Sequence, residues 1–198
     1  MFFLLFSIFE LQAPVQDTLQ FAREKAYENN FSEAQQILAV YNKNNNDVYG
    51  IWLQAQVAWW MGDTEGSLAL YEKAVLLAPD LTELRFDQGQ TLFRAGKIRL
   101  AEPLLKEILG EDPTHTPAKL HLAYIDYWNG KISRSRNTAK HVLNLEPENV
   151  MALQLLEEID TITAPYILLN TSFASDDQPL ESNEYSVSLG KYFSGLFS

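Results

Sequence analysis

Apolar positions follow a helical period from near Phe21 to Ile159, and residues that break helices interrupt this pattern at regular intervals. The glycines of this series are Gly62, Gly96 and Gly130, and the prolines are Pro79, Pro113 and Pro147. Both sets have a period of 34 residues, and each glycine precedes its proline by 17 residues. Such a period is typical of a unit of two antiparallel helices, with glycine at the inner turn and proline at the outer turn. The pattern therefore predicts stacked helix pairs, which build binding surfaces rather than catalytic pockets.

Small residues recur at two places within the 34-residue units. The units are Val48–Leu81, Thr82–His115 and Thr116–Asn149. The small residues of the first helices are Ala55, Gly89 and Ala123, and those that open the second helices are Ser67, Ala101 and Ser135. Because alternating large and small side chains let helices nest, these positions are predicted to be the points of close approach.

The small residues, the glycine between the helices and the proline that ends each unit resemble the tetratricopeptide repeat. The segment from Trp59 to Asp80 matches closely, and the resemblance covers about residues 16 to 160. It implies a mainly α fold, an α-solenoid of helix-turn-helix repeats whose first helices line a binding groove.

Two further segments complete the predicted array of about four repeats plus a capping helix, which spans residues 14–163. In an earlier unit, Ala34 takes the small position, Asn29 replaces the glycine and Asn46 replaces the proline. Asparagine tolerates the left-handed conformation that this turn requires. Residues Val150 to Ile159 are predicted to form a last helix that covers the open end of the stack.

Two residues depart from the repeat pattern. Pro103 falls early in a second helix, where proline is tolerated only within the first turn. Asp126 stands where the family usually places an aromatic side chain, which predicts that its unit packs less tightly.

Residues of the first helices that alternate with the packing positions are predicted to face the groove implied by the resemblance. They are Tyr49, Trp52, Gln56, Trp59, Trp60, Phe86, Gln90, Phe93, Tyr124, Tyr127 and Trp128. A lining this rich in aromatic side chains is suited to stacking against a peptide, a sugar chain or another domain. The alternative is that these side chains pack between neighbouring repeats.

The helical period stops before Pro165, and the remaining sequence has the character of β-strands. Residues Tyr166–Ser175 have strand composition, and Glu184–Phe193 alternate between apolar and small or polar residues. Each segment is near the roughly ten residues that cross an outer membrane at a tilt, with Tyr192 and Phe193 where an aromatic girdle would lie. Two strands cannot close a barrel, so the alternative is a β-hairpin packed on the last repeat.

The N-terminus is a short and very apolar run from Met1 to Phe9. It is too short for a membrane-spanning helix of about 20 residues, but it matches the hydrophobic region of a secretory signal. An export signal at 1–13, repeats at 14–163 and strands in 164–198 together resemble bacterial outer-membrane proteins that carry periplasmic repeats before a β-barrel. The alternatives are a mis-set start codon or a hydrophobic helix lying on the first repeat.

Charge and composition argue against several classes of function. A net charge of -11 disfavours nucleic-acid binding, and the absence of cysteine excludes disulfides and thiol chemistry. No phosphate loop, dinucleotide motif or zinc-protease motif occurs, so no catalytic residue, metal or cofactor is expected. The scattered histidines are His115, His121 and His141, and the acidic connector holds Asp176, Asp177 and Glu181. The connector lacks the oxygen spacing of a calcium site and is predicted to be a solvated loop.

These observations predict a non-enzymatic interaction scaffold at the bacterial cell envelope. Its periplasmic repeats would bind a protein partner, and its C-terminal strands would join an outer-membrane β element. One alternative is a soluble cytoplasmic adaptor that binds a protein through the aromatic groove. Another is glycan handling during polysaccharide export.

Overall fold

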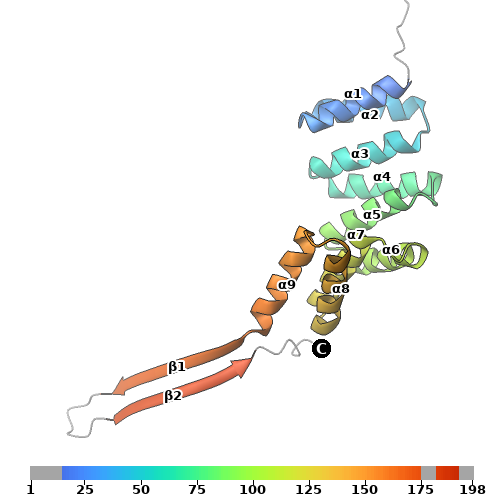
Figure 1. Cartoon of the computed structure of the whole chain (residues 1–198). Helices are drawn as coiled ribbons and strands as arrows, with labels where there is room; N and C mark the ends of the chain where they lie inside the picture. The colour runs from blue at the N-terminus through green and yellow to red at the C-terminus, as the bar shows by residue number, and fades with distance from the viewer. Residues whose placement is uncertain (1–14, 175–181, 192–198) are drawn as a thin grey trace, which may run out of the picture. The chain divides into compact units, whose positions relative to one another are not determined.

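The computed structural model describes residues 15–174 and 182–191, which form nine helices and one antiparallel β-hairpin (Figure 1). The helices are α1 (Val15–Tyr27), α2 (Phe31–Asn44), α3 (Val48–Trp60), α4 (Thr64–Leu77), α5 (Thr82–Arg94), α6 (Ile98–Glu111), α7 (Thr116–Trp128), α8 (Ile132–Leu145) and α9 (Val150–Thr163). The strands are β1 (Pro165–Ala174) and β2 (Ser182–Lys191). The predicted fold class, a mainly α stack of helix pairs with a short C-terminal hairpin, is confirmed.

Some predicted features lie outside the described residues. They are the export signal at 1–13, the acidic connector with Asp176, Asp177 and Glu181, and the strand-end aromatics Tyr192 and Phe193. The chain divides into two compact units, Met1–Leu104 and Leu105–Ser198, and this division falls inside α6.

The inner turns of the helix pairs use left-handed backbone, as the sequence predicts. Gly62, Gly96 and Gly130 have φ angles of 84°, 73° and 72°, which side chains with a Cβ atom rarely adopt. Asn29 has a φ of 61° between α1 and α2, and within the described chain it is the one residue other than glycine with a positive φ. Asparagine tolerates this conformation better than most residues, so the turn geometry persists where glycine is absent.

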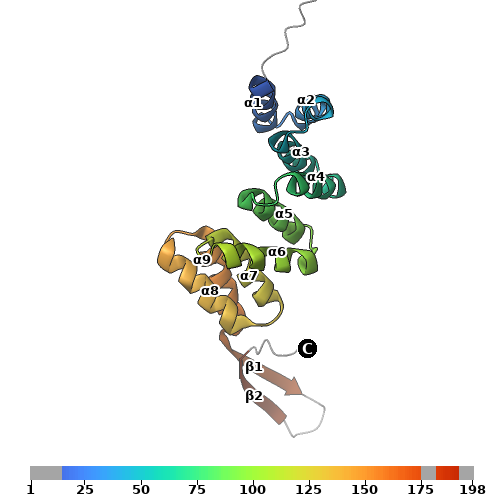
Figure 2. The ribbon, with the colours of Figure 1, turned by 90° about the vertical axis from the view of Figure 1, so that its right-hand side faces the viewer.

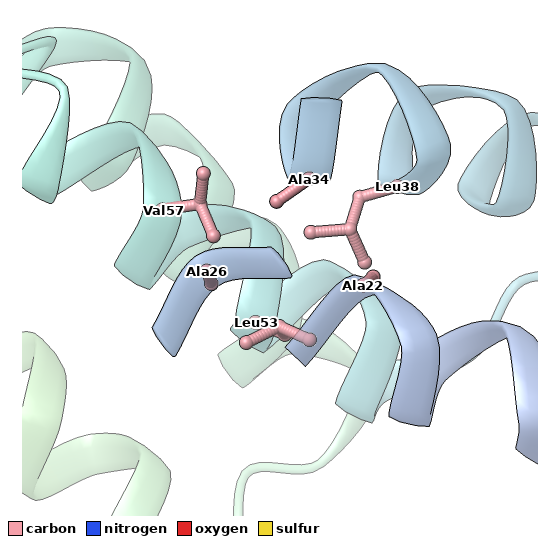
Figure 3. Packing of buried hydrophobic residues seen from close by; sticks show 6 residues of the cluster. All are labelled: Ala22, Ala26, Ala34, Leu38, Leu53 and Val57. Carbon is pink, nitrogen blue, oxygen red and sulfur yellow. The ribbon is translucent and has the colours of Figure 1, made fainter. Parts of the chain in front are cut away.

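The core of the first compact unit begins where α1, α2 and α3 meet (Figure 3). Its buried members are Ala22, Ala26, Ala34, Leu38, Leu53 and Val57. Alanines on α1 and α2 let these two helices approach closely, while the larger side chains from α2 and α3 fill the space between them.

Two of the small residues near the start of the second helices make a hydrogen bond that the sequence spacing does not predict. The hydroxyl of Ser67 donates a hydrogen bond of 2.8 Å to the carbonyl oxygen of Ala55, which belongs to the first helix of the same pair. Ser135 makes the equivalent bond of 2.8 Å to Ala123. Both hydroxyls are buried and satisfied, so each serine ties its helix to the preceding one without a desolvation penalty.

The last helix, α9, lies against α7 and α8 in the second compact unit (Figure 2). It buries Ala152, Leu155 and Ile159, which share core clusters with residues of α7 and α8. This is the packing predicted for the terminal helix, which extends to Thr163.

The structure corrects both expectations about the departures from the repeat pattern. Pro103 is the sixth residue of α6, beyond the first turn, where it lacks the amide needed for a bond to the carbonyl four residues earlier. The sequence predicts loose packing around Asp126, but this residue is only 7% exposed. Its carboxylate accepts two hydrogen bonds of 2.5 Å from the guanidinium of Arg134, and Lys131 lies 3.6 Å away. An ion pair therefore occupies the position instead of an aromatic ring.

The two strands pair in antiparallel register, with Pro165 opposite Lys191 and Ala174 opposite Ser182. They begin one or two residues earlier than the sequence predicts. The side chain of Val187 is 66% exposed. Among the described helices, none is both long and apolar enough to cross a membrane.

Candidate interaction surfaces

The eleven predicted groove residues divide between the two compact units. The first unit holds Tyr49, Trp52, Gln56, Trp59, Trp60, Phe86, Gln90 and Phe93. The second unit holds Tyr124, Tyr127 and Trp128. Tyr49, Trp60 and Trp128 are 54%, 43% and 55% exposed, and the other eight are half-buried. Most of these side chains therefore take part in packing as well as in forming a surface.

In the first compact unit, a carboxylate on α5 accepts hydrogen bonds from two of the predicted groove residues of α3. The indole of Trp52 and the amide of Gln56 each donate a hydrogen bond of 2.8 Å to the same oxygen, Oδ2 of Asp87. Trp52 also packs against the buried cluster that contains Tyr71. Burial raises the pKa of the Tyr71 phenol, and the nearby Asp87 carboxylate raises it further. Trp52 and Gln56 thus hold neighbouring helix pairs together.

Two aromatic rings of this unit, those of Tyr49 and Trp60, contact a neighbouring ring and remain partly exposed. Tyr49 stacks on Trp52, with ring centroids 6.3 Å apart and planes 29° apart. Trp60 ends α3 and tilts against Phe31 of α2, with centroids 5.9 Å apart. These rings are braced by their neighbours but still expose about half of their surface.

In the second compact unit, α7 lies against α9 (Figure 2), and an aromatic side chain of α7 reaches the first part of α9. The hydroxyl of Tyr124 donates a hydrogen bond of 3.2 Å to the carbonyl oxygen of Met151. The rings of Tyr124 and Trp128 lie 6.1 Å apart at 50°, a tilted arrangement. The contact with Met151 fixes one ring, and that ring supports the exposed indole of Trp128.

A hollow of about 520 Å³ lies between α7 and α9, and Tyr127 is the α7 residue in its lining. Its lining residues are Tyr127, Gln154, Glu157, Glu158, Thr161 and Ile162. Burial raises the pKa of Tyr124 and of Tyr127, and the carboxylate of Glu158 raises both further. Glu158 therefore exerts its charge on both phenols. We call this hollow, together with Tyr124 and Trp128, the α7–α9 surface.

The sequence prediction missed the α9 side of this surface, although a signal for it exists. Glu158 follows Tyr124 by one period of 34 residues, and Thr161 and Ile162 follow Tyr127 and Trp128 by the same distance. The repeat pattern, continued into α9, would have selected these residues. The sequence prediction leaves them out because it assigns α9 only the role of a cap over the stack.

The histidine that precedes α7 and the histidine within α7 both have structural contacts. The ring nitrogen Nδ1 of His115 accepts a hydrogen bond of 3.1 Å from the amide of Ala118, which caps the helix. His121 is buried, and its Nδ1 lies 2.8 Å from the carbonyl oxygen of Pro117. Across residues 15–174 and 182–191, no group of three or more histidine, aspartate or glutamate side chains could hold a metal ion.

The arrangement of paired helices defines the chain as a helical-repeat protein of the α-solenoid class. A family model described as tetratricopeptide repeat matches residues 92–159. The match covers part of the helical array, and a solved tetratricopeptide repeat protein shares the fold. No curated protein matches the chain.

Solved structures share the fold at low sequence identity. MamA from Desulfovibrio magneticus RS-1 is 16% identical with a TM-score of 0.66, over 74% of this chain and 84% of that one. A tetratricopeptide repeat protein from Parabacteroides merdae is 15% identical with a TM-score of 0.68, over 77% of this chain and 60% of that one. MamA AMB-1 is 20% identical with a TM-score of 0.62, over 73% of this chain and 86% of that one. These likenesses show that the chain shares the fold of these proteins.

Proposed function

We propose that the helical array is a non-enzymatic scaffold that binds a peptide segment of a protein partner at the α7–α9 surface. The observation that carries this proposal is the hollow of about 520 Å³ beside Tyr127, with the exposed indole of Trp128 on the same helix. Sites for small ligands commonly have volumes of about 300 to 1,000 Å³. The hollow therefore has room for a side chain and the adjoining backbone.

The rings of this surface are suited to binding because they are partly exposed and already positioned. Tyrosine and tryptophan are enriched among the residues that dominate binding energy at protein interfaces. The bond from Tyr124 to the Met151 carbonyl holds its ring in place before a partner arrives. Such preorganisation lowers the entropy lost on binding.

Replacing Trp128 with alanine is expected to weaken binding of a peptide partner about tenfold, because an exposed indole would lose its contact. The probe is a peptide selected from a random 12-residue library on the full chain, and fluorescence anisotropy gives its Kd. Trp60→Ala is the matched control, since it removes a similarly exposed tryptophan from the first compact unit.

The thermal unfolding of both variants, followed by circular dichroism, should remain close to that of the unchanged chain. Equal weakening by Trp128→Ala and Trp60→Ala would contradict the proposed location. A selection that yields no binding peptide would count against the function itself.

We also propose that the scaffold works at the bacterial cell envelope, with the array in the periplasm and the hairpin joined to an outer-membrane β element. Two strands of 10 residues each support this proposal, because strands of about this length cross an outer membrane at a tilt. The apolar run Met1–Phe9 supports export. A hairpin of two strands is also marginal alone and gains stability from additional strands.

Expression of the full chain in a Gram-negative host should yield a shortened product in the outer-membrane fraction. Leu5→Arg should block this export, because a charge disrupts the apolar region that the export machinery recognises. Membrane fractionation and the mass of the product provide the measurement. Recovery of the intact chain wholly in the cytosol would contradict the proposed location.

A further inference from the structure

We infer that the α7–α9 surface recognises a basic side chain of the bound peptide, arginine in preference to lysine. This inference rests on the proposed function and adds the chemistry of the residue that the hollow accepts. Its basis is the combination of a hollow that is open to solvent, a phenol ring in its lining and carboxylates that form no ion pair within the described chain.

Glu157 and Glu158 line the hollow and are exposed. In the part of the chain that the structure describes, neither carboxylate forms an ion pair. The acidic residues around them differ in this respect. Asp126 pairs with Arg134, and Asp160 pairs with Arg136. The charge of the hollow is therefore not neutralised within the described chain.

The basic residue of α8 that reaches α9 is already engaged elsewhere. Arg136 donates one hydrogen bond to the carboxylate of Asp160 and another, of 3.0 Å, to the hydroxyl of Thr163. The whole chain has a net charge of -11, so acidic residues greatly outnumber basic ones. A partner is the natural source of a cation for Glu157 and Glu158, and attraction over this acidic surface would favour its approach.

The lining offers the groups that a guanidinium recognises. Tyr127 presents an aromatic ring, against which a planar guanidinium can stack. Glu158 offers two carboxylate oxygens, and the side chains of Gln154 and Thr161 offer further oxygen acceptors. Arginine has five donors in a fixed plane and is weakly hydrated, whereas lysine carries a compact and strongly hydrated charge. The hollow therefore suits arginine better.

The same charges disfavour an acidic ligand. A peptide carboxylate placed in the hollow would lie near Glu157 and Glu158, and like charges at close range oppose binding. The surface is thus chemically opposite to a site that grips a carboxylate with lysine and arginine side chains.

The test uses 12-residue peptides selected on the full chain, with Kd measured by fluorescence anisotropy. We expect selected peptides to share an arginine, and its replacement by glutamine to weaken binding about tenfold. Glu158→Gln should weaken the arginine peptide about fivefold, and Glu157→Gln combined with Glu158→Gln about tenfold. Glu148→Gln is the control, because it makes the same charge change at an exposed residue outside the hollow and should leave Kd unchanged.

The interaction should also weaken as salt increases, since exposed charges are screened at high ionic strength. The glutamine-containing peptide should show no further loss with Glu158→Gln, which would link that carboxylate to the arginine itself.

Two failures can be told apart. Peptides that require Trp128 but carry no shared basic residue, and whose Kd ignores Glu158→Gln, would overturn this inference and leave the proposed function intact. Peptides whose Kd ignores Trp128→Ala, or the absence of any binding peptide, would overturn the proposed function and this inference with it.

Discussion

Replacing Ser67 with leucine is expected to lower the free energy of unfolding of the first compact unit by about 3 kcal/mol. Ser67 is fully buried where α4 begins, and its hydroxyl lies 2.8 Å from the backbone carbonyl oxygen of Ala55. A leucine side chain cannot occupy this space unless α3 and α4 move apart. That movement would disturb the packing of both helices, because protein interiors are filled to nearly crystalline density.

Ser67→Ala is the matched control, because it removes the hydrogen bond without adding volume. It should cost only about 1 kcal/mol. Alanine already occupies the equivalent position at Ala34 and Ala101, where it is also fully buried. Urea denaturation followed by circular dichroism measures both changes. If leucine and alanine at position 67 gave the same midpoint, the close approach of the two helices would not be the limiting factor.

Replacing Asp87 with alanine is expected to cost about 2 to 3 kcal/mol of stability. The change removes the oxygen that accepts hydrogen bonds from both Trp52 and Gln56. Two half-buried donors would lose their partner, and the tie between α3 and α5 would be lost. The indole of Trp52 should become more accessible to water, so tryptophan emission should move to longer wavelength alongside the lower denaturation midpoint.

Glu83→Ala removes a negative charge from an exposed residue of the same helix and should change stability by no more than about 0.5 kcal/mol. Asp87→Asn should lie between the two, because its amide keeps one oxygen acceptor but loses the charge. Equal effects of Asp87→Ala and Glu83→Ala would show that the shared acceptor contributes nothing measurable.

The backbone of the array was largely predictable because its turns depend on local chemistry. A glycine at Gly62, Gly96 or Gly130 supplies the left-handed conformation whatever lies around it, and the structure has positive φ at all three. Asn29 was recognised for the same reason. Pro103 was placed less well, since its position relative to the first residue of α6 depends on where that helix begins.

The side-chain partners were not predictable to the same degree. The repeat pattern places Trp52 and Gln56 on one face of α3, but it does not say that both donate to a carboxylate 35 and 31 residues away. Tertiary packing decides which polar groups meet. The sequence predicts loose packing at Asp126 because the pattern does not show that Arg134, on the next helix, pairs with its carboxylate.

The sequence selects the α7 side of the candidate site, Tyr124, Tyr127 and Trp128, whose role in binding stays a prediction. The bond from Tyr124 to α9 is a packing contact of the kind that the alternative interpretation predicts. The acidic wall of the hollow comes from α9 and appears only when the two helices are placed side by side. The composition predicts that the chain is acidic, but it does not predict which acidic residues line the hollow.

The uniform length of the helix pairs has a consequence for how this gene can change. A duplication or loss of 34 codons, wherever it begins, leaves every following helix in phase with the turns that flank it. Recombination between neighbouring copies can therefore lengthen or shorten the array by whole helix pairs. Changes of other lengths fit between the pairs, as in the loop before α3, where the spacing from Asn29 to Gly62 is one residue less than the usual period.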